Sequence, residues 1–242
     1  MKASELVERG DYFSSKKLYE EAYVCYLEAA LSEKDGDAFY ELGRMYLYGR
    51  YVDRDYAKAF KYFRISFDIT GSSRGMIDIM LNEYDEITSD KEGRRNCRNY
   101  FDYMLEHGEF CMYVTIGCEY GIGRLYDLDY QRKIDYMYKA IEKGYNIGYD
   151  IIAEMYFEGK GVEQNYEKAY EFLMQYKGKA STAKPFILAE MYRCGLYLKT
   201  DIDKAMDLYR SVIDDFDEIP EAPDEYYQRA CEIIKKMKGE TN

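Results

Sequence analysis

The chain has 242 residues, 47% of them hydrophobic and 33% charged, a composition that excludes an intrinsically disordered protein. Its formal net charge is −12, with 46 acidic against 34 basic side chains. This balance argues against nucleic acid as a ligand, because phosphates are neutralised by clustered lysine and arginine. An acidic surface favours basic segments of other proteins, or it serves solubility alone.

The N-terminal sequence MKASELVERGD lacks the continuous apolar stretch of a secretory signal, and no later run approaches the length of a membrane span. We therefore expect a cytoplasmic protein without membrane insertion. Cysteines near apolar helical patterns are expected to be reduced and to pack as small hydrophobes. They are Cys25, Cys97, Cys111, Cys118, Cys194 and Cys231.

A short pattern around a tyrosine returns along the chain and defines a repeat. The copies are GRMYLYG (43–49), GCEYGIG (117–123), AEMYFEG (153–159) and AEMYRCG (189–195). The tyrosines at 46, 84, 120, 156 and 192 are separated by 38, 36, 36 and 36 residues. A regular array of similar units is therefore predicted.

A second pattern follows each copy of the first, as in YAKAFKYF (56–63) and YEKAYEFL (166–173). In both patterns apolar residues lie three or four apart, which predicts two helices in each repeat. The second pattern has a small or apolar residue at its centre, which is Ala22, Ala59, Ile134, Ala169 or Ala205 in the successive copies.

In chain order, six helix pairs are predicted at about 3–33, 37–71, 72–108, 109–144, 145–178 and 179–215. One pair cannot cover its own apolar faces, so the pairs must stack, and we predict a single repeat domain over residues 1–242. A further helix at about 223–238 follows Pro220 and Pro223 and ends in lysines, which suits a C-terminal cap.

The turn between the two helices of a pair carries its own signals. In EGKGVEQN (158–165), Gly159 can adopt the left-handed conformation that ends a helix, and Asn165 can cap the next one. Asp55 and Asp201 are predicted to cap in the same way. Small residues at the positions of Gly43 and Ala59 allow neighbouring helices to approach closely.

The unit 72–108 is the least regular. The polar stretch SDKEG (89–93) replaces the glycine turn, and Cys97 stands where other units have alanine. We expect a bend or local mobility in this unit.

The segments AFYELGRMYLYGRYVDRDYAKAFKYF (38–63) and DIIAEMYFEGKGVEQNYEKAYEFL (150–173) resemble the Sel-one-like repeat, a relative of the tetratricopeptide repeat. The resemblance covers nearly the whole chain, is weak in unit 72–108, and in unit 3–33 is closer to a tetratricopeptide repeat. It implies an all-α, right-handed superhelix (a solenoid) whose first helices line a concave surface. It also implies a role as a scaffold or adaptor that binds other proteins.

Positions that line the groove in the related repeat map onto eleven residues here, and we expect them to face outward. Tyrosine with carboxylates would suit an extended or helical peptide that carries basic and apolar groups. The alternative is that they form ordinary solvated helix faces. They are Tyr40, Arg44, Tyr48, Val114, Cys118, Asp150, Glu154, Glu158, Phe186, Glu190 and Arg193.

Signals for catalysis are weak. His107 is the only histidine, which excludes a zinc site with two histidines, and its place before Gly108 suits a helix end. Ser-x-x-Lys occurs at Ser14 and at Ser181, but the accompanying SDN and KTG elements of penicillin-binding enzymes are missing. The G-I-G at 121–123 is interpreted as a turn. The basic cluster Arg94, Arg95 and Arg98 is interpreted as a solvated face.

These observations predict a non-catalytic interaction scaffold without metal or cofactor. The alternative is a receptor of the same fold that senses a peptide or small ligand, with unit 72–108 as its hinge.

Overall fold

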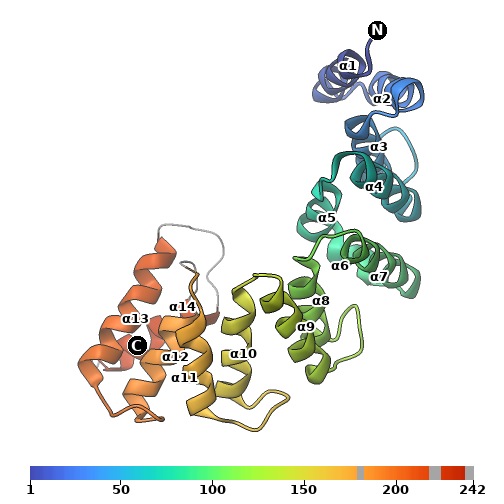
Figure 1. The fold of residues 1–242 in the computed structure, drawn as a ribbon. Helices are drawn as coiled ribbons and strands as arrows, with labels where there is room; N and C mark the ends of the chain where they lie inside the picture. The colour runs from blue at the N-terminus through green and yellow to red at the C-terminus, as the bar shows by residue number, and fades with distance from the viewer. Residues whose placement is uncertain (179–182, 218–224, 238–242) are drawn as a thin grey trace. The chain divides into compact units, whose positions relative to one another are not determined.

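The computed structural model describes residues 1–178, 183–217 and 225–237, and these contain fourteen α-helices, one π-helical turn and no strand (Figure 1). The predicted all-α fold class is therefore confirmed. The chain divides into two compact units, residues 1–112 and 113–242. That all 242 residues form one repeat domain stays a prediction.

The first unit consists of helix pairs. The first two pairs pack closely within themselves, while the third has a first helix made of three short pieces. The elements are α1 (Ala3–Ser15), α2 (Tyr19–Glu33), α3 (Gly36–Tyr48), α4 (Tyr56–Thr70), α5 (Arg74–Asp78), the π-turn (Ile79–Glu83), α6 (Tyr84–Thr88) and α7 (Lys91–Glu106).

The second unit contains three further pairs and a last helix that packs on α12 and α13. Its elements are α8 (Met112–Ile122), α9 (Tyr130–Glu142), α10 (Ile147–Glu158), α11 (Tyr166–Gln175), α12 (Ala183–Cys194), α13 (Ile202–Asp217) and α14 (Glu225–Met237). The helix α14 matches the predicted cap, and Pro220 and Pro223 lie outside the described residues.

Four of the six pairs close their turn with the same set of backbone hydrogen bonds. The N–H of Asn165 donates to the carbonyl of Tyr156, nine residues earlier, at 2.9 Å, and its side chain accepts from the N–H of Lys168 at 2.9 Å. Both bonds recur with Asp55 after Tyr46, with Asp129 after Tyr120 and with Asp201 after Tyr192. The predicted caps are therefore confirmed. We call this arrangement the nine-residue clasp.

The glycine three residues after the tyrosine of each clasp ends the first helix in the left-handed conformation. This was predicted for Gly159, where φ is +70°. The tyrosine ring of each clasp packs against the second helix. Tyr156 stacks on Phe172 with ring centroids 5.7 Å apart, and Tyr46 stacks on Tyr62 at 5.6 Å. The second and fifth pairs thus join a clasp to a half-buried ring contact.

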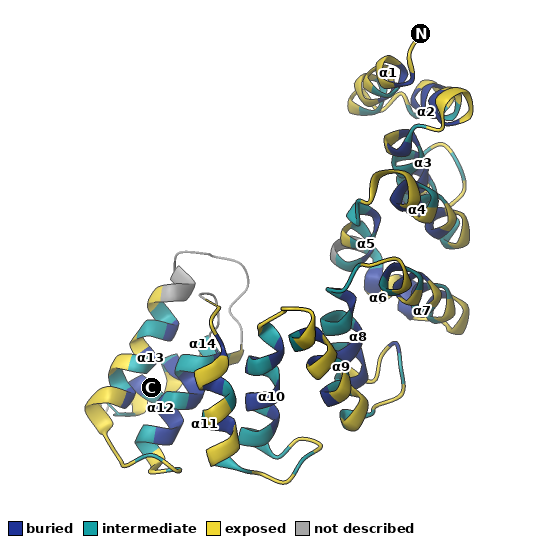
Figure 2. Ribbon diagram, viewed as in Figure 1, coloured by how far each residue is buried: buried dark blue, intermediate teal, exposed yellow. Residues whose placement is uncertain are grey.

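Close approach of the two helices depends on the small residue three positions before the tyrosine. A Cβ on Gly43 would lie 2.6 Å from the ring of Phe63, so only glycine fits there without movement. The central residues Ala59 and Ala169 of the second helices are buried, and the buried residues line the inside of every pair (Figure 2). The core of each pair therefore lies at its helix–helix contact.

The third pair lacks the clasp. Its cap, Asp90, follows Tyr84 by only six residues and accepts from the N–H of Gly93 at 2.8 Å. The π-turn interrupts the first helix between α5 and α6. Tyr84 still stacks on Phe101, with ring centroids 6.4 Å apart and planes 8° apart. The expected bend or mobility stays a prediction.

All six cysteines are free thiols, and Cys25 and Cys97 are buried as expected. Cys194 is exposed, so the expectation of packing is wrong for this residue, which lies at the end of α12. In the described ranges, no helix has the length and apolar character needed to cross a membrane.

Candidate functional site

The predicted binding residues lie on the first helices of their pairs, and we call the set of these positions the first-helix face. Each of the two units carries its own part of it. In the first unit, Tyr40, Arg44 and Tyr48 are half-buried and lie one helical turn apart on α3.

These three side chains gather around one carboxylate, Asp78 of α5. The hydroxyl of Tyr40 donates to Oδ2 of Asp78 at 2.7 Å, and that of Tyr48 donates to Oδ1 at 3.4 Å. Arg44 lies with Nε 3.5 Å from Oδ2 and donates to Glu41 at 3.2 Å. Burial, together with Asp78, raises the pKa of Tyr40. The cluster therefore joins the second and third pairs through a polar network.

In the second unit, the face begins with Val114 and Cys118 on α8, both of which are half-buried. Burial raises the pKa of the Cys118 thiol, so it is a thiol and not a thiolate at neutral pH. Among the charged groups, Lys133 lowers this pKa, whereas Glu119 and Glu154 raise it. This part of the face combines an apolar strip with an acidic edge.

The rest of the face on α10 is contacted by the last helix of the chain. Arg229 Nη1 of α14 lies 4.0 Å from Oε1 of Glu158, and Tyr226 of the same helix packs on Phe186 with ring centroids 5.1 Å apart. Burial, with Glu154 next, raises the pKa of Tyr226. The cap helix thus presents an aromatic and a basic side chain to the predicted binding residues.

Three of the eleven residues do not face outward as expected. Phe186 is fully buried because Tyr209 and Tyr226 pack on its ring, at 5.8 and 5.1 Å between centroids, and Arg229 lies 4.5 Å above it. Asp150 is also buried. The expectation of outward exposure is therefore wrong for both.

Glu190 is the third buried residue, and its carboxylate is already used inside the pair. It accepts from Arg193 Nη2 at 2.7 Å and from the hydroxyl of Tyr209. Arg193 Nε also donates to that hydroxyl at 3.1 Å. Glu190 and Arg193 thus hold α12 to α13.

The residues that sequence reasoning missed are Asp78, Tyr226 and Arg229. Asp78 lies in the irregular unit, where the repeat register could not be assigned. Tyr226 and Arg229 lie in the helix interpreted only as a cap, although their spacing of three places them on one helical face. That spacing was the available signal.

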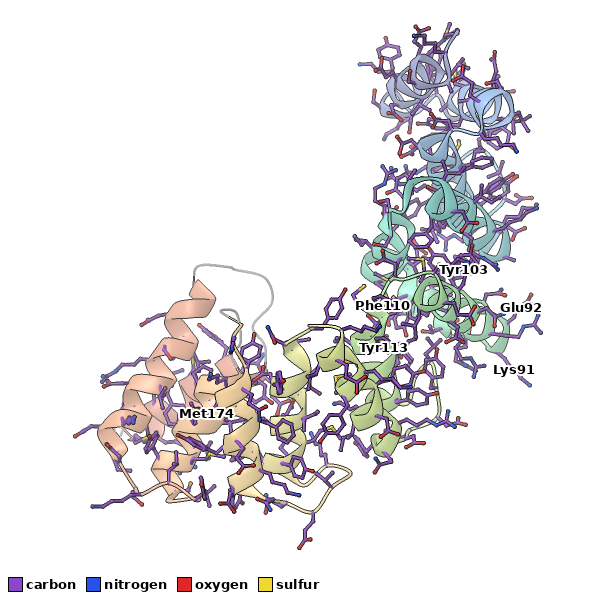
Figure 3. The ribbon with its side chains drawn as sticks, viewed as in Figure 1. Lys91, Glu92, Tyr103, Phe110, Tyr113 and Met174 are labelled. Carbon is purple, nitrogen blue, oxygen red and sulfur yellow. The ribbon has the colours of Figure 1, made fainter. Side chains whose placement is uncertain are left out.

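His107 and Arg94, which were considered as possible signals of catalysis, form hydrogen bonds with backbone carbonyls. His107 caps α7, with Nδ1 2.8 Å from the carbonyl oxygen of Tyr103, as its place at a helix end predicted. Arg94 donates to the carbonyls of Thr88 and Ser89 at 2.7 and 3.3 Å, while Lys91 and Glu92 point away from the helix pair at the start of α7 (Figure 3).

Ser181 of the second Ser-x-x-Lys lies outside the described residues. In the described part of the chain, no group of three or more histidine, cysteine, aspartate or glutamate side chains is arranged to hold a metal ion.

Comparison with known families identifies three Sel1 repeats in this chain, at residues 37–68, 145–173 and 186–211. These segments cover most of α3 with α4, of α10 with α11, and of α12 with α13. The resemblance to the Sel-one-like repeat is thereby confirmed. A search of curated proteins gives no significant match.

Two solved structures share the fold. One is c5321, a protective antigen present in uropathogenic Escherichia coli strains displaying an SLR fold, with a TM-score of 0.61 and 22% identity. The match covers 96% of this chain but 54% of the antigen. The other is a Sel1 repeat protein from Oxalobacter formigenes, with a TM-score of 0.54, 21% identity and coverage of 96% and 99%. At these identities the likeness shows the fold alone.

Proposed function

We propose that this chain is a non-catalytic scaffold that binds a segment of a partner protein on the first-helix face. The observation that carries the proposal is the docking of α14, whose Tyr226 and Arg229 pack on Phe186 and whose Arg229 lies near Glu158. The chain's own helix is thus an internal example of the kind of segment that this surface accepts.

The proposed partner segment carries aromatic or apolar groups together with lysine or arginine. Half-buried carboxylates at Glu154 and Glu158 favour a basic side chain through charge-assisted hydrogen bonds. Val114 and the neutral Cys118 offer apolar contact beside them. In the first unit, Tyr40 and Tyr48 supply rigid rings that lose little conformational entropy on binding. A net charge of −12 would speed the approach of such a segment.

Buried residues, and residues paired with a buried one, are not expected to contribute binding energy directly. Phe186, Asp150 and Glu190 are buried, and Arg193 is paired with Glu190. We therefore assign partner contact to Tyr40, Arg44, Tyr48, Val114, Cys118, Glu154 and Glu158. Nucleic acid is not a proposed partner. A cytoplasmic location and the lack of a cofactor stay predictions.

An affinity pull-down from native cell extract, with partners identified by mass spectrometry, tests this function. The chain should capture a partner whose recovery falls at least about tenfold in a variant with Tyr40→Ala, Glu154→Ala and Glu158→Ala. Circular dichroism should show that this variant remains helical.

The matched control also removes one tyrosine and two carboxylates, but from exposed positions on second helices, with Tyr138→Ala, Glu171→Ala and Asp207→Ala. Recovery from the control should equal that from the unchanged chain. Equal loss in both variants, or no loss in the first, would contradict binding on the first-helix face.

A further inference from the structure

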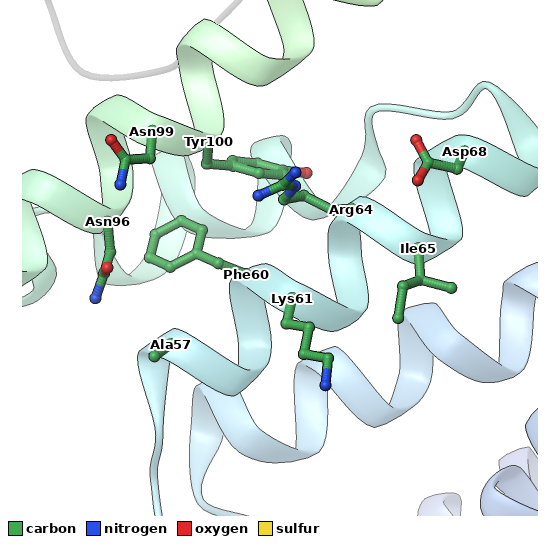
Figure 4. Close-up of a pocket in the computed structure, with 9 residues that line it drawn as sticks. All are labelled: Ala57, Phe60, Lys61, Arg64, Ile65, Asp68, Asn96, Asn99 and Tyr100. Atoms are coloured by element: carbon green, nitrogen blue, oxygen red, sulfur yellow. The ribbon is translucent and has the colours of Figure 1, made fainter.

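A cavity of about 400 Å³ lies between the second helices α4 and α7 of the first unit (Figure 4). This volume is within the range of small-molecule sites in proteins. The cavity is built from second helices, whereas the proposed partner face is built from first helices. Its lining is Ala57, Phe60, Lys61, Arg64, Ile65, Asp68, Asn96, Asn99 and Tyr100.

Two buried aromatic rings form the apolar part of the cavity. Phe60 comes from α4 and Tyr100 from α7, and their centroids are 5.3 Å apart with the planes tilted by 51°. Both side chains are fixed by burial, at 5% and 1% exposed. The rings form the floor of the cavity, and a flat apolar group that packs against them must first displace the side chains that cover them.

The hydroxyl of Tyr100 is buried and has no hydrogen-bond partner among the described residues. Figure 4 shows the ring reaching from α7 toward α4, with the hydroxyl on the side of Arg64. A buried hydroxyl without a partner is unfavourable, because it has lost water and gained no bond in return. An acceptor atom from a ligand would satisfy it.

Cationic and amide groups line the outer part of the cavity. Lys61 is exposed and makes no ion pair in the part of the chain that the structure describes. The Arg64 guanidinium lies 3.8 Å from the ring centroid of Tyr103, which holds it in place. The one carboxylate, Asp68, accepts a hydrogen bond from the hydroxyl of Tyr103. Asn96 and Asn99 add amide donors.

We propose that this cavity binds a small organic anion that has a flat apolar body and one carboxylate or phosphate group. The body packs on Phe60 and Tyr100, and the anionic group takes hydrogen bonds from Lys61, Arg64 and the Tyr100 hydroxyl. This inference goes beyond the scaffold function and gives the alternative, ligand-sensing function a defined site.

Such a ligand would contact both α4 and α7, so it would tie the second pair to the irregular third pair. Lys61 and Arg64 outnumber the one carboxylate of the rim, Asp68, which already accepts a hydrogen bond from Tyr103, so the rim favours an anion over a neutral ligand.

The test uses the full chain with four probes: 2-naphthoate, 1-naphthyl phosphate, the neutral 2-naphthamide and inorganic phosphate. Titrations followed by amide NMR should show saturable changes at residues 57–68 and 96–103 with at least one naphthyl anion. Which anion binds more tightly distinguishes carboxylate from phosphate. The neutral amide and inorganic phosphate should each bind at least about tenfold more weakly, since each lacks one recognition element.

Three variants locate the site. The double variant Lys61→Gln with Arg64→Gln should weaken binding of the tighter naphthyl anion at least about tenfold. Tyr100→Phe, which keeps the ring, should weaken its binding at least about threefold. Arg95→Gln removes an equally exposed charge elsewhere on α7 and should change affinity less than about twofold.

Absence of saturable changes at these residues with both anions up to about 10 mM would overturn the proposal. Affinity that is unchanged in the double variant would overturn it equally. Neither result affects the pull-down test of the first-helix face, because none of the substituted residues belongs to that face.

Discussion

The second and third helix pairs of the first unit show which parts of the repeat are separable. In the second pair, a continuous α3 is closed by the nine-residue clasp from Tyr46 to Asp55. In the third pair, the first helix is broken by a π-turn and the clasp is absent, yet Tyr84 still stacks on Phe101. The ring contact therefore persists without the clasp, and packing across the pair is the more general feature.

The sequence spacing between the two stacked rings also shows that the ring contact tolerates a change in the chain between the helices. It is sixteen residues from Tyr46 to Tyr62 and from Tyr156 to Phe172, but seventeen from Tyr84 to Phe101. The π-turn at 79–83 precedes Tyr84, so it accommodates part of the longer interval from Tyr46 to Tyr84 and not the extra residue between Tyr84 and Phe101. Register is thus restored at the ring contact although the chain between Tyr46 and Tyr84 is longer than one repeat.

The largest expected difference between the two pairs concerns glycine. In Gly93→Ala, the new Cβ would lie 1.8 Å from the backbone carbonyl oxygen of Ile87, so α6 and α7 must separate. In Gly43→Ala, it would meet the Phe63 ring, a side chain that can shift. We expect a loss of about 3 kcal/mol or more for Gly93→Ala and about 1–2 kcal/mol for Gly43→Ala.

Urea unfolding followed by circular dichroism measures both values. A Gly93→Ala chain as stable as Gly43→Ala would mean that the contact between α6 and α7 adapts easily.

The next largest effect is expected from a motif ring in a regular pair. Tyr156 is half-buried and stacked on Phe172, so Tyr156→Ala should cost about 2–3 kcal/mol, less than a fully buried ring. Tyr156→Phe keeps the stack and should cost less than about 0.5 kcal/mol. Thermal unfolding of the two variants tells them apart, and a small loss in Tyr156→Ala would show that the ring contact is not a main source of stability.

The smallest effect is expected from the clasp itself. Asn165→Ala removes the side-chain cap of α11 but keeps the backbone bond to Tyr156, and should cost about 1 kcal/mol. Asp90→Ala, in the pair without a clasp, removes a comparable cap and should cost a similar amount. If Asn165→Ala destabilises as strongly as Tyr156→Ala, the clasp and not the ring contact governs the regular pairs.

The regular pairs could be predicted from sequence because their physical signals are local. Apolar spacing sets the two helices, Gly159 ends one and Asn165 begins the next, and all of these lie within a short stretch of chain. The three matched Sel1 segments fall where these signals are strongest.

The third pair could be recognised from the sequence as irregular, but its helix boundaries and register could not be predicted. Its register depends on a π-turn, which replaces only a few hydrogen bonds and has no strong sequence signature. One signal was present: Leu81 occupies the position three before the tyrosine, where the other pairs have Gly43, Gly117, Ala153 or Ala189. A larger residue at a position of close approach marks the place where the helix departs from the pattern.

The binding residues were predicted less well than the fold because burial depends on contacts distant in sequence. Phe186 was expected to face outward from its position in the repeat, but α14 returns to cover it. Glu190 was expected to be available, but Tyr209 and Arg193 satisfy its carboxylate. Repeat position assigns a helix face, whereas tertiary contacts decide which residues on that face stay accessible.

Site-specific photocrosslinking in native cell extract tests the central claim most directly. A benzophenone amino acid at Val114, on the first-helix face, should give a covalent adduct with a partner protein. The same group at Glu171, exposed on the second helix α11, should give none. Adducts at Glu171 and none at Val114, or no adduct at either position, would contradict partner binding on the first-helix face.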